Sequence, residues 1–193
     1  MFVLTSIMAH AQADLPTSNV IGLYINPAFM RVSNSDTDSG PFAFLGNNTT
    51  ERMFYGASIG GYYDFFHGKS FNAGADVRDT IVHGNNASLN SFLLGARVEA
   101  KPIAFSLKPY AELLGGVGSS KPPTSSVHVS RAAYGVFGGV DYQFSNHVDF
   151  RMVEVGYGSV QTVNSGNFGG PVSLPASKLL TISTGLVFHF NAP

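Results

Sequence analysis

Residues 53–65 read MFYGASIGGYYDF, and the residues alternate between two sets with a period of two. The set that starts at Met53 and ends at Phe65 is apolar, whereas the set between them is mostly Gly, Ser and Asp. Successive side chains of a β-strand point to opposite faces, so this alternation is typical of a strand. The stretch predicts a strand with one face in an apolar environment.

The same alternation recurs along the chain. It is found at about residues 20–32, 71–81, 91–99, 105–117, 133–144, 148–160 and 179–190, and no window has a sustained helical stripe instead. Two interruptions are Pro27, in the first segment, and Asp79, on the apolar set of 71–81. We expect an all-β fold with eight antiparallel strands.

One segment keeps its alternation only with a local irregularity. In residues 148–160 a β-bulge near Met152 and Val153 would turn both side chains outward. Arg151 and Glu154 would then share the opposite face. The sequence therefore predicts a bulge at this position.

The links between the segments alternate in length. Residues 33–52, 119–130 and 159–177 are long and polar, 83–88 is of medium length, and 67–70, 101–104 and 145–147 are short. Up-and-down membrane barrels have short turns at one end and long loops at the other, with both termini at the short-turn end. The pattern predicts an eight-stranded up-and-down transmembrane β-barrel.

The amino-acid composition indicates that much of the protein surface is apolar. Only 12% of the 193 residues are charged, about half the share in soluble domains, and the 22 glycines exceed the usual share of about 7%. A net charge of -1 excludes the basic surface of a nucleic-acid binder, and the lack of Cys excludes disulfides and thiolate sites. We expect no nucleic-acid partner.

The first residues resemble an export signal. An apolar run at residues 2–9 is followed by Ala11-Gln12-Ala13, a small-x-small cleavage pattern. We expect a signal peptide at residues 1–13 and the barrel domain at 14–193. Because no basic residue precedes the run, the true start would lie upstream; a frayed apolar terminus is the alternative.

Ten charged residues fall on the polar set of the strands, which in a membrane barrel faces the lumen. They are Asp64, Asp76, Arg78, Arg97, Glu99, Lys108, Glu112, Asp141, Arg151 and Glu154. An eight-stranded lumen is just wide enough for side chains to fill, and buried charges persist only when they are paired. We therefore expect a salt-bridge network that closes the lower and middle lumen.

Aromatic residues gather at the predicted strand ends. Near the short links lie Phe65, Phe71, Phe105, Phe144, Phe150, Phe188 and Phe190, and near the long links lie Tyr55, Phe92, Tyr134 and Tyr157. Membrane barrels carry such girdles where they cross the two interfaces. Aromatic residues in a soluble β-sandwich core would not be sorted by strand end.

The end of the chain carries the most specific pattern. Leu180, Ile182, Leu186, Phe188 and Phe190 form an apolar series that ends in Phe, interrupted by Thr184. The part formed by Leu186, Phe188 and Phe190 resembles the C-terminal signal by which outer-membrane barrels are recognised for assembly. Residues 18–190 resemble the small outer-membrane β-barrel family, the type of the OmpA transmembrane domain and of the OmpX and OmpW groups. The resemblance implies a Gram-negative-type outer membrane and the barrel-assembly machinery as a partner.

Catalytic patterns are present only superficially. Gly56-Ala57-Ser58-Ile59-Gly60 fits a nucleophile elbow, yet Ser58 lies in a strand rather than at a strand-turn-helix tip. Residues 115–121 resemble a phosphate loop, but Pro122 occupies the position of the required hydroxyl residue. The six histidines have no metal-ligand spacing. We expect no catalytic residue, no metal and no cofactor.

These observations favour a structural, surface-exposed membrane protein. We expect a monomer with a plugged polar lumen, long extracellular loops for adhesion or partner contact, and outer-membrane lipid and lipopolysaccharide as its surroundings. Two alternatives stay open, a small gated pore and a soluble or periplasmic lipocalin-like ligand-binding barrel. A lipocalin-like barrel would carry abundant Lys and Glu on its outer face.

Overall fold

The computed structural model describes residues 20–38, 40, 43–102, 104–161 and 176–191. The predicted signal peptide at residues 1–13 lies outside these residues. The strands are β1 Val20–Asp38, β2 Thr49–His67, β3 Phe71–Gly84, β4 Ala87–Ala100, β5 Leu107–Lys121, β6 Val129–Gln143, β7 Val148–Val160 and β8 Ser177–Asn191, with a short 3-10 turn η1 at Ala104–Ser106.

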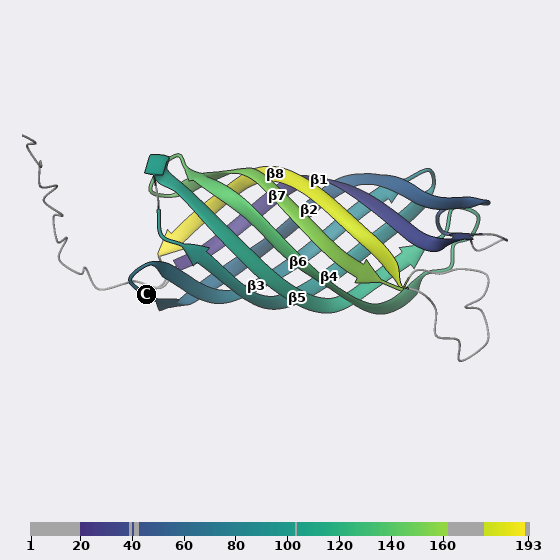
Figure 1. The fold of residues 1–193 in the computed structure, drawn as a ribbon, viewed down its shortest axis with the longest axis horizontal. Helices are drawn as coiled ribbons and strands as arrows, with labels where there is room; N and C mark the ends of the chain where they lie inside the picture. Colours follow the sequence, from purple (N-terminus) through teal and green to yellow (C-terminus); the bar gives the residue numbers. More distant parts are fainter. Residues whose placement is uncertain (1–19, 39, 41–42, 103, 162–175, 192–193) are drawn as a thin grey trace, which may run out of the picture.

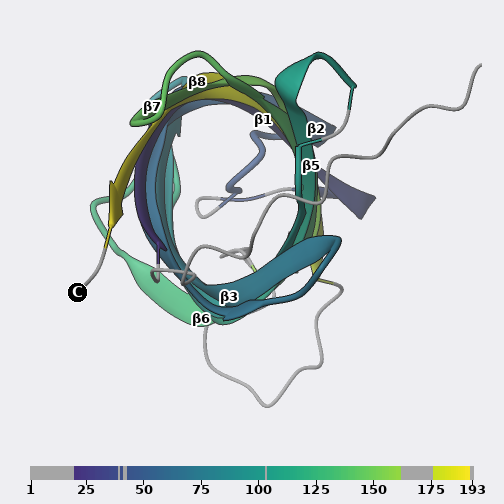
Figure 2. The same cartoon turned by 90° about the vertical axis from the view of Figure 1, so that its left-hand side faces the viewer.

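The strands close into a single antiparallel barrel in chain order. Each strand pairs with the next, and β1 pairs with β8 to complete the ring. Figure 1 shows the ring from the side, with the start of β1 and the end of β8 at the same end, and Figure 2 shows it along its axis. The predicted fold class is confirmed. No helix in the described part of the chain is long and apolar enough to span a membrane.

The two faces of each strand differ sharply. On β2, the outward Ile59 is 55% exposed whereas its inward neighbour Ser58 is 1% exposed. Each aromatic residue predicted for a girdle has an exposed side chain, and Phe29 contacts Tyr55 edge-on at 5.6 Å between ring centroids. The outside is therefore the apolar face, which is the reverse of a lipocalin-like barrel.

Two β-bulges adjust this alternation. The bulge predicted at Met152 and Val153 is confirmed, because the pairing of β7 shifts there and both side chains point outward. A second register shift in β2 turns Phe65 and Phe66 outward together. The bulge in β7 also explains Thr184, whose hydroxyl donates a 2.8 Å hydrogen bond to the carbonyl of Arg151.

Several predicted links differ from the structure. Strands β1, β2, β5 and β6 extend into the links expected at 33–52 and 119–130, which leaves 39–48 and 122–128. The link at residues 83–88 is a two-residue turn at Asn85 and Asn86, with φ of 47° and 62°, and is therefore shorter than the medium length expected. Asn tolerates the left-handed conformation that such tight hairpins require. The link expected at 101–104 runs on to Ser106, and Phe105 lies in η1 rather than in a strand.

Candidate functional site

The lumen brings together most of the charge of the barrel. Of the ten residues predicted to face it, nine are at most 5% exposed, and the side chain of Lys108 is 12% exposed. They project from the inward faces of β2 to β7. Burial of this kind requires close pairing, since an isolated charge in a low-dielectric interior is strongly unfavourable.

Arg78 occupies the middle of the network. Its guanidinium donates to both carboxylate oxygens of Glu154 at 2.8 and 2.7 Å and to Glu112 at 2.8 Å. Its Nε donates to the hydroxyl of Tyr24 at 3.1 Å. Glu154 also accepts hydrogen bonds from Tyr110 at 2.6 Å and Ser183 at 2.9 Å. Residues from five strands thus converge on one carboxylate and one guanidinium.

The other two arginines extend the network. Arg97 pairs with Glu99, with Glu112 at 2.9 Å and with Asp141 at 3.7 Å. Arg151 forms a bidentate pair with Asp141, at 2.9 and 3.1 Å, and reaches Glu154 at 3.1 Å. Glu112, Asp141 and Glu154 are therefore each shared between two arginines, whereas Glu99 pairs with Arg97 alone.

Aromatic rings separate the arginines from one another. The order is Tyr62, Arg97, Tyr110, Arg151, Tyr24, Arg78 and Phe137, and each guanidinium carbon lies 4.0–5.4 Å from the centroids of the rings on both sides. We call this series the arginine–aromatic stack. Cation–π contacts of this kind strengthen in desolvated sites, so the rings offset part of the cost of burying three cations.

Each ring of the stack lies over a glycine on the neighbouring strand. Tyr24 is paired with Gly60, Tyr62 with Gly22, Tyr110 with Gly139 and Phe137 with Gly156. A Cβ on any of these glycines would overlap the ring. The glycine excess of the sequence is thus in part a space requirement of large rings in a narrow barrel.

A second, smaller cluster closes the short-turn end. Asp149 accepts a 2.7 Å hydrogen bond from Lys108 and lies 2.9 Å from Nε2 of His189. The hydroxyl of Tyr62 lies 3.4 Å from the other ring nitrogen of His189. Asp149 was not among the residues predicted to face the lumen, although it shares the inward face with Arg151 two residues further along β7.

Two predicted members stay outside the ion pairs. Asp76 accepts a hydrogen bond from Tyr24 at 2.9 Å. Asp64 is 2% exposed and has no ion pair among the described residues. The paired charges therefore comprise eight of the ten predicted residues together with Asp149 and His189.

Toward the outer end the lumen holds a large apolar cluster beside buried Ser and Thr side chains, which the expectation of a polar lumen did not include. Its inward side chains form one buried cluster that includes Met30, Leu93 and Leu114. Phe44 and Leu45, from the link between β1 and β2, fold into this cluster and are at most 1% exposed, and Phe44 stacks on Phe54 at 5.2 Å. Alternation indicates which strand residues point inward, but it does not show that a link folds back into the barrel. The apolar side chains at this end provide the surface against which Phe44 and Leu45 are buried.

The remaining candidate motifs lie in regular strands. Ser58 faces the lumen and hydrogen-bonds Thr80 at 2.8 Å, and the glycines of residues 115–118 belong to β5. Neither segment has the strand-turn-helix context that its chemistry requires. Within the described ranges no three acidic or histidine side chains are placed to hold a metal ion.

Comparisons with known proteins identify the fold of this chain but no family. No family model and no curated protein matches the sequence. Neisserial surface protein A, NspA, has a TM-score of 0.58 at 15% identity, covering 88% of this chain and 97% of that one. Ail, the attachment invasion locus protein of Yersinia pestis, has a TM-score of 0.51 at 12% identity, covering 90% and 100%. The chain has the fold of the small eight-stranded outer-membrane β-barrels.

Proposed function

We propose that this outer-membrane β-barrel is a non-conducting structural protein whose outer end serves contact with partners or surfaces. The observation that carries the proposal is the filled lumen. Three arginines with no exposed surface lie between four aromatic rings across the interior. Eight strands leave room for side chains and little else.

The two halves of the lumen are filled by different means. The arginine–aromatic stack occupies the half toward the short turns, and Phe44 and Leu45 occupy the apolar half. A void of about 20 Å³ lies between them, lined by Thr80, Ser91 and Thr181 among others. A space of this size holds about one water molecule.

The outside of the barrel supports a lipid-facing role. Side chains such as Leu94, Leu113 and Val136 are 55–64% exposed, and they lie in a belt between the two aromatic girdles. Exposure of this much apolar surface to water is unfavourable. We propose outer-membrane lipid and lipopolysaccharide as the surroundings of this belt.

We propose that none of the remaining features of the barrel is catalytic. Leu186, Phe188 and Phe190 lie outward near the end of β8, at the short-turn end, where we propose that they act as the recognition signal for the barrel-assembly machinery. The pairing of β1 with β8 closes the barrel without a partner strand, which supports the proposal of a monomer. An enzymatic role on lipid A would appear as a changed acyl pattern in mass spectra of lipid A from expressing cells, and we expect an unchanged pattern.

Conductance tests the proposal directly. Purified protein is reconstituted in planar lipid bilayers, with a general porin in the same membranes as positive control. We expect current at the background of protein-free membranes at all voltages. Stable single-channel steps would contradict a filled lumen and indicate the alternative, a small gated pore.

A further inference from the structure

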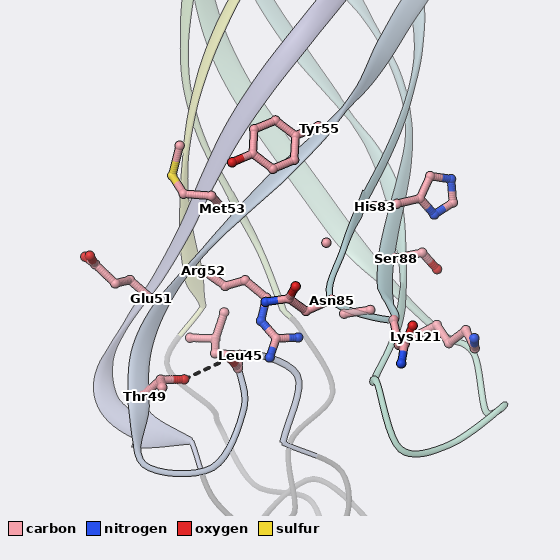
Figure 3. Close-up of a pocket in the computed structure, with 13 residues that line it drawn as sticks. Leu45, Thr49, Glu51, Arg52, Met53, Tyr55, His83, Asn85, Ser88 and Lys121 are labelled. Carbon is pink, nitrogen blue, oxygen red and sulfur yellow. Dashed lines mark hydrogen bonds between the residues drawn. The ribbon is translucent and has the colours of Figure 1, made fainter.

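The outside of the barrel carries a hollow at its short-turn end. It has a volume of about 450 Å³, and among the described residues no polar atom lines it. We call it the girdle groove, and its lining consists of Phe105, Leu107, Tyr142, Phe150 and Met152. A hollow of about 810 Å³ at the outer rim has charged and polar side chains instead, as Figure 3 shows. Water can fill the rim hollow favourably, whereas the girdle groove requires an apolar occupant.

The register of three strands brings the lining of the girdle groove together. Leu107 on β5 pairs with Tyr142 on β6, and Tyr142 pairs with Phe150 on β7, so these side chains form one row. Met152 lies two residues further along β7, at the β-bulge where it and Val153 both point outward. The walls of the groove are therefore built on regular strands, which hold their side chains in fixed positions.

Phe105 closes the girdle groove toward the short turns. It lies in η1, the teal turn ahead of β5, at the end of the barrel where β8 finishes (Figure 1). Phe105 and Ser106 both have left-handed backbone conformations, with φ of 60° and 59°, which are unfavourable for residues other than glycine. Phe105 is also 86% exposed, so burial of its ring within the protein does not offset this strain. A contact with a molecule outside the chain would offset it.

Smaller residues continue the girdle groove toward the middle of the membrane. Beyond the row of Leu107 come the pairs of Pro109 with Val140 and of Ala111 with Gly138. A Cβ placed on Gly138 would lie 3.6 Å from its nearest described neighbour, the carbonyl oxygen of Tyr110, which is ordinary contact. Packing within the barrel therefore does not require glycine there, in contrast to the glycines under the rings of the arginine–aromatic stack.

The length of this path matches the depth of one leaflet. Four residues of β5 rise about 13 Å along the strand, which is about 10 Å across the membrane at a strand tilt of about 40°. One leaflet of the hydrocarbon core is about 15 Å deep. The path from Leu107 to Ala111 thus covers about two thirds of a leaflet.

The end of the barrel at which the girdle groove lies selects the leaflet. Phe105 and Phe150 are at the short-turn end, and the short turns of outer-membrane barrels are periplasmic. The groove therefore opens onto the inner leaflet of the outer membrane, which consists of phospholipid. Because it is continuous with the apolar belt of the barrel, acyl chains are the apolar groups that reach it.

We propose that the girdle groove holds one acyl chain of a phospholipid in the inner leaflet of the outer membrane. The chain lies along the row of Leu107, Tyr142 and Phe150, and it ends over Ala111 and Gly138. The ring of Phe105 packs against the part of the chain nearest the headgroup. The assignment rests on the proposed lipid surroundings of the belt, and it does not depend on whether the lumen conducts.

Photo-crosslinking tests the site in vesicles of phosphatidylethanolamine and phosphatidylglycerol. A trace of phosphatidylethanolamine carries a diazirine on one acyl chain, and mass spectrometry of peptides locates the labelled residues of the full-length protein. In the closed ring β1 lies opposite β5, so Leu23, outward on β1, is the reference. We expect residues of the girdle groove to be labelled at least about fivefold more than Leu23. Equal labelling around the barrel would indicate ordinary bilayer contact only and would overturn the site.

Two pairs of variants show whether the groove itself causes this labelling. Leu107→Trp fills the groove, and Leu23→Trp makes the same change on the opposite wall. Phe105→Ala removes the closing ring, and Phe144→Ala removes another exposed ring near the same end. Leu107→Trp and Phe105→Ala should each lower the labelling of Phe150 and Met152 at least about threefold, and the two controls should change it less than about 1.5-fold. Equal effects within each pair would overturn the assignment. The mobility shift on boiling in SDS checks that all four variants fold.

The headgroup and the membrane placement are tested in the same experiment. Phosphatidylglycerol with the same diazirine chain should label the girdle groove alike, because the lining is apolar. Labelling by only one of the two lipids would overturn the assignment to the acyl chain. Labelling that spares every outward side chain would instead contradict the proposed lipid surroundings. Uniform labelling refutes the site and leaves those surroundings intact, so the two failures are distinguishable.

Discussion

Replacement of Arg78 by Met tests how much the buried network contributes to stability. Met has a similar length and fills the space between the rings of Tyr24 and Phe137, but it removes one of the three guanidinium groups. Glu154 then loses two hydrogen bonds and Glu112 loses one, while both remain buried. The perturbation is therefore a loss of charge pairing at nearly constant volume.

The structure sets the expected size of this effect. Removal of one partner of a buried ion pair costs about 3–5 kcal/mol, because the other partner stays buried and charged. Arg151 and Arg97 still contact the two carboxylates, so we expect about 3 kcal/mol, the lower end of that range. Arg78→Lys keeps the charge but cannot bridge both carboxylates as a planar fork, and its loss should be smaller.

Equilibrium unfolding in urea, in lysolipid micelles, measures these differences. The chain has no Trp, so circular dichroism and the gel shift replace tryptophan fluorescence. Arg31→Met is the matched control, since Arg31 and Glu51 form an exposed pair with side chains 49% and 55% accessible, worth about 1 kcal/mol or less. If Arg78→Met lowers the free energy of unfolding no more than Arg31→Met does, the argument that the network stabilises the barrel is refuted.

Two further predictions concern single side chains on opposite faces of the wall. Asp79 lies on the outward face, opposite Ile59 and Phe92, and one of its oxygens has no hydrogen-bond partner among the described residues. Asp79→Leu should therefore raise the free energy of unfolding by about 1 kcal/mol in the urea assay, and a decrease would show that the carboxylate has a stabilising partner. Phe44→Ala should lower it by about 3 kcal/mol, because the ring is fully buried against Phe54. No change in that variant would mean that the link is not held in the lumen.

The barrel itself was predictable because its signal is local. Period-two alternation depends only on the geometry of one strand, and it located all eight strands. The bulge in β7 was predictable for the same reason, since only a bulge places Arg151 and Glu154 on one face. The two-residue turn at Asn85 and Asn86 was within reach as well, because Asn favours the left-handed conformation found there.

The pairing and packing of side chains inside the barrel were harder to predict from the sequence. Alternation placed ten charged residues inside, but it could not assign Glu154 to Arg78, which lies 76 positions away along the chain. The pairing of Tyr24 with Gly60 depends on the register between two strands, and the burial of Phe44 depends on where a link folds. Each of these is decided by distances across the barrel.

By itself, the sequence determined the number of strands, the face of each strand that meets the apolar surroundings, and the end of the barrel at which the first strand begins and the last strand ends. The tertiary structure alone decided how the lumen is filled, with an arginine–aromatic stack in one half and an apolar cluster around Phe44 in the other. It also decided that the β3–β4 hairpin ends in a two-residue turn at Asn85 and Asn86. The physical reason is that inward or outward orientation follows from the backbone of one strand, whereas pairing, packing and hollows depend on the stagger of strands around the closed ring.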